Sequence, residues 1–190
     1  NMSSATQRYQ CREIFAKAVC GKGRKFSQST HSVTPANQPV HILGAWIINH
    51  KYKAIKSGDY VEIVGSFDLN VWYACEKNTK TEVANQTVSY VDQVPLSFLD
   101  GNMQDDDVQV LVTPTLEPNC IDAYLAPNGN YFVVEVEREF LVEVIGETKL
   151  SVLVCATEDD WSDKDFDLEL GSDPQTEELA DDDEADELLL

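Results

Sequence analysis

The sequence predicts a mainly β protein: an antiparallel β-sandwich or partly closed barrel with a short N-terminal helix and a disordered acidic C-terminal tail. Three observations lead to this prediction. Apolar and polar residues alternate through the middle of the chain, apolar residues recur at helical spacing near its start, and acidic residues dominate its end. A chain of 190 residues is long enough for one core of ordinary size with appendages at both ends.

Residues 1–30 are predicted to form a basic helix and a linker. Apolar residues recur there at positions i, i+3, i+4, i+7 and i+8, the pattern of one helix face; they are Cys11, Ile14, Phe15, Ala18 and Val19. Gly21 stands where a left-handed C-cap would end the helix, and Gly23 is interpreted as a bend. Six basic residues and one acidic residue lie between Arg8 and Lys25, a net charge of +5. We expect this helix to pack on the core or to contact another subunit.

Residues 31–157 are predicted to form the β domain. Apolar residues occupy alternate positions from Val61 to Tyr73 and from Phe132 to Val144, so one face of each strand is expected to be core and the other solvated. Asn128-Gly129, just before the second stretch, predicts a tight hairpin turn. About eight short strands are predicted in all; the further candidates are residues 42–49, 81–91, 94–99, 108–112, 121–125 and 150–156.

The stretch GSFDLNVWYA, residues 65–74, breaks its own alternation at Trp72. The polar positions that precede Trp72 in the series are Ser66, Asp68 and Asn70. If Val71 and Tyr73 continue the core face, Trp72 lies on the outer face, where a large aromatic serves a protein contact. The alternative is a β-bulge that shifts the register and buries Trp72. We expect the outer face and a role for Trp72 in a protein contact.

Residues 158–190 form the predicted tail. They hold 16 acidic residues and one base, a net charge of −15, whereas the other 157 residues carry −5. Charge repulsion and sparse apolar residues predict disorder, so the tail is either a solvated chain or a docking arm whose apolar residues bind partners. Its Asp181–Glu184 cluster lacks the spaced ligands and turn glycine of a calcium site. The residues predicted to recruit partners are Trp161, Phe166, Leu168, Leu188, Leu189 and Leu190.

The composition limits the functional classes. The net charge is −20 and the pI is near 4.2, which argues against general nucleic-acid affinity because phosphate binding needs a cationic surface. No apolar run of about 18 residues and no secretory signal is seen, so we expect a soluble protein made in a cytoplasm, without membrane insertion. Five scattered cysteines are interpreted as small buried residues, with at least one thiol free or able to link chains.

No catalytic constellation is recognisable. The three histidines lack helical ligand spacing and are interpreted as loop or strand-end residues; they are His31, His41 and His50. Glu135, Glu137 and Glu139 share one strand face, with about 6.6 to 7 Å between alternate positions. That separation would suit an inverting glycosidase pair, but one solvated face explains the pattern more simply. We therefore predict a non-enzymatic protein without cofactor or metal.

Five segments of the chain, followed by an acidic tail, resemble one known family. They are REIFAKAVCGKGRKFSQST, ILGAWIINHKY, VEIVGSFDLNVWYACEKNTKTEV, EPNCIDAYLAPNGN and EREFLVEVIGETKLSV. In this order they resemble CotE, the family of morphogenetic proteins of the outer spore coat in Bacillus-type endospore formers. The similarity covers residues 12 to about 155 closely and the tail in composition. Strings such as WIINHKY, NVWY and NTKTEV are unusual, so the resemblance is specific.

The resemblance implies a scaffold and not an enzyme. Proteins of this family self-associate, settle on the basement layer around the forespore by contacting its coat morphogenetic proteins, and recruit outer-coat proteins. Synthesis in the mother-cell cytoplasm and deposition in the spore coat are implied with it. The N-terminal part supports self-assembly, and the acidic part is implicated in recruitment. The residues that we assign to self-assembly beside Trp72 are Ile14, Phe15, Lys22, Arg24 and Lys25.

Two further classes share the predicted layout. A β-sandwich chaperone of basic client proteins, similar to nucleoplasmin, also carries a disordered acidic tail, and binding to histones in moderate salt would distinguish it. A carbohydrate-binding sandwich would use Trp46, Trp72 and Tyr73 as stacking platforms and would show affinity for cell-wall glycans. The unusual strings favour the coat scaffold over both.

Overall fold

The computed structural model describes residues 9–155, which form seven β-strands and no helix. The strands are β1 Tyr9–Val33, β2 Pro39–Ser57, β3 Tyr60–Cys75, β4 Lys80–Pro95, β5 Phe98–Leu99, β6 Gln104–Leu125 and β7 Phe132–Cys155. Contacts divide the described chain into two units, residues 9–12 with residues 151–155, and Glu13–Leu150. Among the described residues, no helix is long and apolar enough to cross a membrane.

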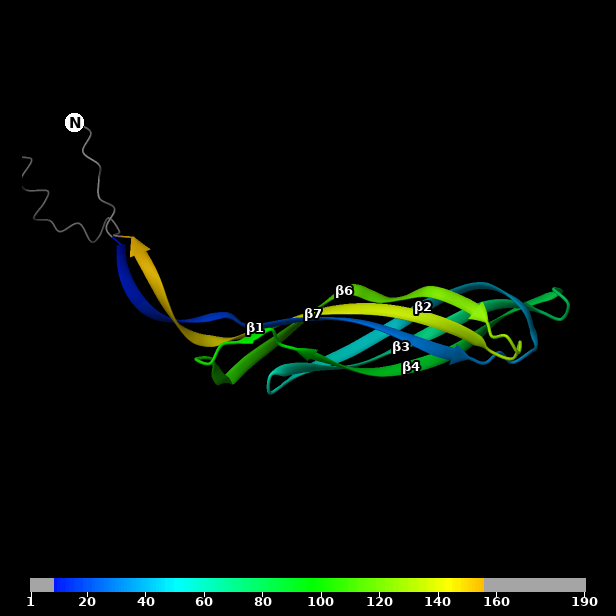
Figure 1. Cartoon of the computed structure of the whole chain (residues 1–190), viewed down its shortest axis with the longest axis horizontal. Helices are drawn as coiled ribbons and strands as arrows, with labels where there is room; N and C mark the ends of the chain where they lie inside the picture. The colour runs from blue at the N-terminus through cyan, green and yellow to red at the C-terminus, as the bar shows by residue number, and fades with distance from the viewer. Residues whose placement is uncertain (1–8, 156–190) are drawn as a thin grey trace, which may run out of the picture. The chain divides into compact units, whose positions relative to one another are not determined.

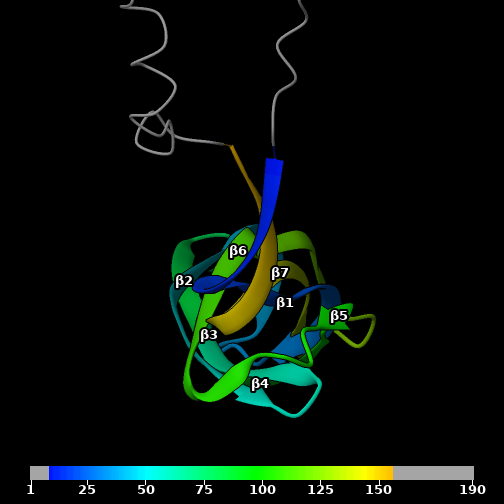
Figure 2. The ribbon, with the colours of Figure 1, turned by 90° about the vertical axis from the view of Figure 1, so that its left-hand side faces the viewer.

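Two antiparallel sheets form the second unit. One has the strand order β5-β1-β7-β6 and the other the order β2-β3-β4. The six long strands of the two sheets are labelled in Figure 1. Viewed along the strands, the two sheets enclose a common interior (Figure 2). No ladder of hydrogen bonds joins one sheet to the other within the described chain, so the fold is a sandwich and not a closed barrel.

The core fills the space between the two sheets and comes mainly from β3 and β7. The alternation predicted for these two segments is confirmed, because every second side chain is buried on one face. The largest fully buried side chains are Tyr73, Phe67, Phe132, Phe140, Ile63, Leu69, Val33, Val61, Val71, Val94, Val134 and Val136. Full burial of one such aliphatic or aromatic side chain contributes about 1.5–3 kcal/mol to the free energy of folding.

The hairpin predicted at Asn128-Gly129 is confirmed between β6 and β7. Gly129 has a φ of 74°, a left-handed conformation that glycine adopts without steric cost. Its N–H donates to the carbonyl of Ala126 at 2.8 Å, and Ala126 N–H donates to the carbonyl of Tyr131 at 2.8 Å. The turn therefore sets the register in which β7 returns beside β6.

The helix predicted over residues 11–19 is wrong, because Tyr9–Val33 is one continuous strand. β1 lies beside β7 in the sheet, with an ion pair of 2.9 Å between Glu13 and Lys149 and a contact between Cys20 and the Gly146 carbonyl. Pairing with a distant strand satisfies the main chain of this segment, and this long-range interaction overrides its helical apolar spacing.

The two glycines of GKGRK are not a helix stop and a bend. Both lie in β1 where the connection from β4 to β5 crosses it: Ser97 N–H donates to the Lys22 carbonyl at 2.7 Å. A Cβ added to Gly23 would overlap the carbonyl of Pro95, and one added to Gly21 would lie 3.3 Å from the carbonyl of Phe98. Glycine at both positions lets the crossing chain approach the strand backbone.

Candidate interaction surface and buried polar network

Trp72 lies on the outer face of the β2-β3-β4 sheet, as expected. Its neighbours Val71 and Tyr73 point into the core with 0% and 1% exposure, whereas Trp72 is 43% exposed. The alternative of a bulge in this strand is wrong, because β3 pairs with β4 without a register shift and places Trp72 opposite Val83. The alternation of side chains between the two faces of the strand is by itself enough to place this bulky aromatic on the surface.

A second tryptophan lies on the same face. Trp46 of β2 is 41% exposed and stands opposite Asn70, while Trp72 stands opposite Gly44. The two indoles are therefore diagonal neighbours, and Asn70 between them is buried although its strand position faces outward. We call the exposed apolar residues gathered here the tryptophan face: Trp46, Ile48, Trp72 and Val83.

The tryptophan face has the chemistry of a protein contact. Tryptophan combines a large apolar area with one N–H donor, and exposed apolar residues that adjoin one another mark interaction sites. Tyr73, the third platform of the carbohydrate-binding alternative, does not belong to this surface. Its ring lies in the core 5.2 Å from that of Phe132.

The residues predicted for self-assembly fall on two different sheets. Ile14 and Phe15 are exposed on β1, at 39% and 63%, whereas Trp72 belongs to the opposite sheet. Lys22 and Arg24 are exposed on β1, but Lys25 follows on the other side of the strand and is half-buried. Arg24 lies 3.6 Å from Glu139 of β7, so part of the basic charge is paired within the sheet.

The residues predicted to recruit partners lie in residues 158–190 and are outside the described residues. The cysteine interpretation holds for Cys20 and Cys75, which are buried, and fails for Cys11 and Cys155, which are exposed; Cys120 is intermediate. All five are free thiols in the single chain. Burial raises the pKa of the Cys75 and Cys120 thiols, which disfavours their reactive thiolate forms.

A buried ion pair that was not predicted joins the two sheets. Arg138 of β7 donates from Nε and Nη2 to the two carboxylate oxygens of Asp92 of β4, each at 2.8 Å, and both side chains are nearly inaccessible. The guanidinium also lies 4.1 Å from the centroid of the Tyr90 ring. A bidentate pair of this kind satisfies the charge of both groups in a low-dielectric interior.

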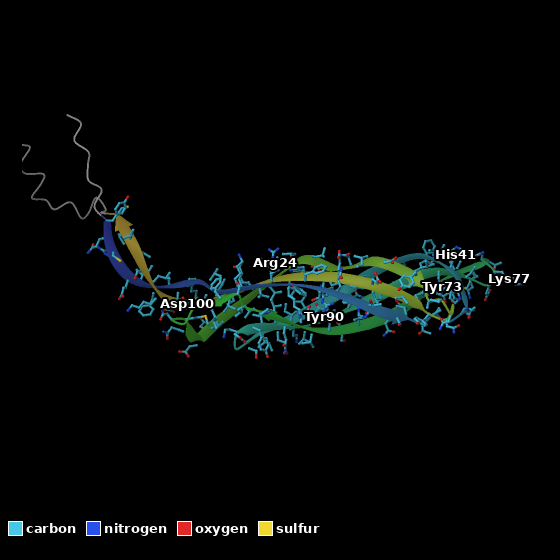
Figure 3. All side chains as sticks on the ribbon, viewed as in Figure 1. Arg24, His41, Tyr73, Lys77, Tyr90 and Asp100 are labelled. Carbon is cyan, nitrogen blue, oxygen red and sulfur yellow. The ribbon has the colours of Figure 1, made fainter. Side chains whose placement is uncertain are left out.

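The network continues from Tyr90 to His50 of β2. His50 Nε2 hydrogen-bonds with the Tyr90 hydroxyl at 2.6 Å, and His50 Nδ1 with Glu117 of β6 at 2.8 Å. Burial raises the pKa of Tyr90, so its hydroxyl is neutral at ordinary pH. Tyr90 lies midway along the sandwich between the labelled residues Tyr73 and Asp100 (Figure 3).

A bulge in β2 turns His50 inward. The register shifts between Ile48 and Lys51, which leaves Asn49 and His50 opposite one position of β3. Asn49 has a φ of 56°, a left-handed conformation that asparagine tolerates, and its side chain donates to Asp68 at 2.8 Å on the outer face. The interpretation of His50 as a loop or strand-end residue is therefore wrong.

The sequence did contain a signal for the ion pair. Arg138 follows Phe132, Val134 and Val136 on the core face of its strand, and Asp92 holds the corresponding position in β4. A charged residue at a core position needs a partner of opposite charge, because an unpaired buried charge is strongly unfavourable. No comparable signal exists for His50, since a bulge is not visible in the apolar pattern.

The network is structural in geometry. Its charge pair, Arg138 with Asp92, is buried between the sheets, and the network reaches the surface at Glu117, whose side chain is 63% exposed. Burial, and secondarily the positive charge of Arg138, lower the pKa of His31 of β1, which keeps this imidazole neutral beside the network. Within the described chain, no group of three or more histidine, cysteine, aspartate or glutamate side chains is arranged to hold a metal ion.

A second polar cluster fixes the loop between β1 and β2. The Tyr73 hydroxyl and the Asn37 amide donate to Glu82 at 2.8 Å, and Lys80 Nζ lies 2.9 Å from the same carboxylate. The hydrogen bonds from Lys80, Asn37 and Tyr73 lower the pKa of Glu82 to about 2. His41 and Lys77 lie near Tyr73 at this end of the sandwich (Figure 3).

Comparison with known proteins gives one match. A family model described as Outer spore coat protein E (CotE) matches residues 10–188. No curated protein matches the chain. No solved structure matches it either. The match covers nearly the whole chain and does not favour the acidic-tailed chaperone.

Proposed function

Because the chain belongs to the CotE family of outer spore coat proteins, we propose that it is a self-assembling scaffold of the endospore coat that organises and recruits outer-coat proteins. The family is structural and is not known for catalysis. The observation that carries the self-assembly proposal is the tryptophan face. Two half-exposed indoles side by side are costly in solvent and favourable in an interface.

Two kinds of contact would hold copies together. Apolar contacts through Trp72, Ile14 and Phe15 would hold a small oligomer together independently of salt. The bases Lys22, Arg24 and Lys25 would attract the acidic residues 158–190 of a neighbour, a head-to-tail contact that repeats from copy to copy. The basic segment from Arg8 to Lys25 and the acidic residues 158–190 carry net charges of opposite sign. The second contact is therefore electrostatic and sensitive to salt.

Residues 158–190 would recruit other coat proteins. Their apolar residues stand among carboxylates, so a partner with an apolar groove rimmed by basic side chains would fit them; they are Trp161, Phe166, Leu168, Leu188, Leu189 and Leu190. Synthesis in the mother cell would deliver the protein to the forespore surface from the cytoplasmic side.

Electron microscopy of the purified full chain, beside the chain that lacks residues 158–190, tests this function. We expect ordered assemblies from the full chain, and a shortened chain that stays folded and oligomeric but no longer captures outer-coat proteins from a sporulating-cell extract. A full chain that is monomeric at all concentrations would contradict the scaffold. A shortened chain that still captures every partner would contradict the role of the tail.

Light scattering across a salt series tests the two kinds of contact. Near 1 M salt the Debye length falls to roughly 3 Å, so large assemblies should loosen while a small oligomer persists. Reversing the charges of Lys22, Arg24 and Lys25 together should have the same effect at low salt. Large assemblies that survive both treatments would show that the charged ends do not hold them together.

A further inference from the structure

The free edge of β4 is an unprotected surface for strand pairing. In the order β2-β3-β4, β4 has a hydrogen-bonded neighbour on one side only. An edge strand presents unpaired N–H and C=O groups, and proteins normally protect such edges with charges, prolines, bulges or short length.

The other edges of the sandwich carry more of these protections than the central stretch of β4, Val83–Val91. β2 and β6 have repeated register shifts, β6 contains Pro114 and Pro118, and β5 has only two residues. β1 carries lysine and arginine residues as far as Lys25. In contrast, β4 reads VANQTVSYV between Val83 and Val91, without a charge, proline, glycine or register shift.

The ladder between β3 and β4 determines which main-chain groups reach the free edge. Leu96 N–H donates to the Asp59 carbonyl at 2.9 Å, one step beyond the pair Tyr60 and Pro95. Hydrogen-bonded and non-hydrogen-bonded pairs alternate in an antiparallel ladder. Even-numbered residues of β4 therefore bond to β3, and odd-numbered residues such as Thr87 direct their N–H and C=O to the free edge.

A side chain supports this assignment. The amide of Gln86 donates to the carbonyl oxygen of Thr87 at 3.2 Å, which shows that this oxygen is within reach of a group that is not part of the ladder. A local side-chain bond of this kind satisfies an edge acceptor in place of a neighbouring strand. The acceptor becomes available to another chain when the flexible Gln86 side chain moves.

The outward residues of β4 have the same order of apolar and polar positions from either end of the strand, with Thr87 at the centre. Apolar residues stand at both ends, Val83 at 48% and Val91 at 59% exposure, and three small or medium polar residues lie between them. In order, the series is Val83, Asn85, Thr87, Ser89 and Val91. A sequence that is symmetric about its centre is suited to antiparallel pairing with a copy of itself around a twofold axis.

We propose that β4 pairs antiparallel with β4 of a second copy of this chain, around a twofold axis at Thr87. This register places Val83 opposite the partner's Val91, Asn85 opposite the partner's Ser89, and Thr87 opposite the partner's Thr87. All five odd-numbered pairs are then hydrogen-bonded, about ten main-chain bonds in total. The two three-stranded sheets then become one continuous six-stranded sheet. This inference rests on the proposed function: it names the surface through which the chain would self-assemble.

The tryptophan face extends across this pairing. On β3, Trp72 stands beside Val83 and Val64 stands beside Val91. Each side of the twofold axis therefore carries one apolar row: Trp72, Val83, the partner's Val91 and the partner's Val64. Cross-strand apolar pairs and the polar pairs between them each contribute roughly 0.2–1 kcal/mol to a sheet, so side chains and main chain favour the same register.

Cysteine cross-linking of the full chain tests the register. In a chain with Cys11→Ser, Cys120→Ser and Cys155→Ser, we expect Thr87→Cys to form a disulfide-linked dimer under mild oxidation, because the two sulfurs meet at the twofold axis. The matched control is Ser89→Cys, on the same face of the same strand, whose copies lie about 13 Å apart by strand rise. Equal cross-linking at both positions, or none at position 87, would overturn the proposal.

A charge exchange gives a second readout by sedimentation velocity. Val83→Lys with Val91→Lys places like charges opposite one another and should weaken dimerisation at least tenfold, whereas Val83→Lys with Val91→Glu places opposite charges together and should restore it. The control is Val40→Lys with Ile55→Lys on β2, which should leave the dimer intact. If both β4 variants dimerise like the unmodified chain, the edge pairing is wrong while the scaffold stands; a monomeric unmodified chain would contradict the scaffold itself.

Discussion

The two faces of the β2-β3-β4 sheet reverse the usual distribution of side chains. The inner face buries a charge pair, Asp92 with Arg138 from the other sheet, while the outer face exposes two tryptophans. Strand parity imposes both placements, but the energetic outcome differs. The buried charges compensate each other, whereas the described chain covers the two indoles only in part, leaving 41% of Trp46 and 43% of Trp72 exposed. The comparison teaches that the inner face is complete in one copy and that the outer face is suited to a second one.

The strongest test of the inner face is Asp92→Ala. It leaves the Arg138 guanidinium buried without its carboxylate, which should cost about 3–5 kcal/mol of the free energy of unfolding. Urea unfolding followed by circular dichroism measures the change. As a control, Asp92→Leu with Arg138→Met removes both charges and should be less destabilising than the single variant. A single variant that is as stable as the double would show that the pair is not closed inside the core.

Gly65→Ala tests whether the inner face also depends on close packing. Gly65 of β3 is directly opposite Tyr90, and an added Cβ would overlap the Tyr90 ring, which carries the hydrogen bond to His50 and the contact with Arg138. Overpacking of this kind costs about 1–3 kcal/mol. Gly44→Ala is the matched control, because no atom lies within 4 Å of a Cβ added there. Thermal melts of the two variants should differ clearly, and equal melting temperatures would contradict this role of Gly65.

The sequence was sufficient for a mainly β, antiparallel fold, its core faces and the turn at Asn128-Gly129, because strand alternation and turn chemistry are local signals, but it left open whether the strands form a sandwich or a partly closed barrel. It also placed Trp72 correctly, since parity carries over from Val71 and Tyr73. It was insufficient for residues 11–19, where the partner strand β7 lies more than 100 residues away and replaces helical hydrogen bonds with sheet bonds.

The length of the strands and the buried polar network depend on register shifts and on contacts between the two sheets. The apolar pattern of the sequence reveals neither. The segments predicted as residues 108–112 and 121–125 are one strand, β6, because register shifts accommodate Pro114 and Pro118. The positions of Asp92 and Arg138 on core faces were readable, but their meeting across two sheets was not. Neither the inward position of His50 nor the full length of the strands could be predicted from the sequence pattern. In both cases a bulge changes the face of the sheet toward which a side chain points.

Trp72→Ala tests the outer face. If the tryptophan face is an interface, truncation should weaken association by roughly 2 kcal/mol and folding by about 0.5 to 1 kcal/mol. Sizing by light scattering and thermal melts of the same sample separate the two effects. Ile55→Ala, an exposed apolar position of β2, is the control and should change neither quantity. A large fall in melting temperature with unchanged size would show that Trp72 supports the fold and not the contact.

The smallest effect is expected where the inner face meets solvent, at Glu82. The folded-state pKa of this carboxylate is about 2, below the ordinary value of 4.5, because Lys80, Asn37 and Tyr73 donate to the charged form. A depressed carboxyl pKa stabilises the fold above pH 4.5 and loses that contribution as the pH falls through about 2. Glu82→Gln should therefore flatten the loss of unfolding free energy between pH 5 and pH 2 and lower stability slightly at pH 7. Solvent reaches and screens this partly exposed group, so the change should be far smaller than that of Asp92→Ala. Equal pH slopes for the two chains would show that the cluster does not anchor the loop to Tyr73.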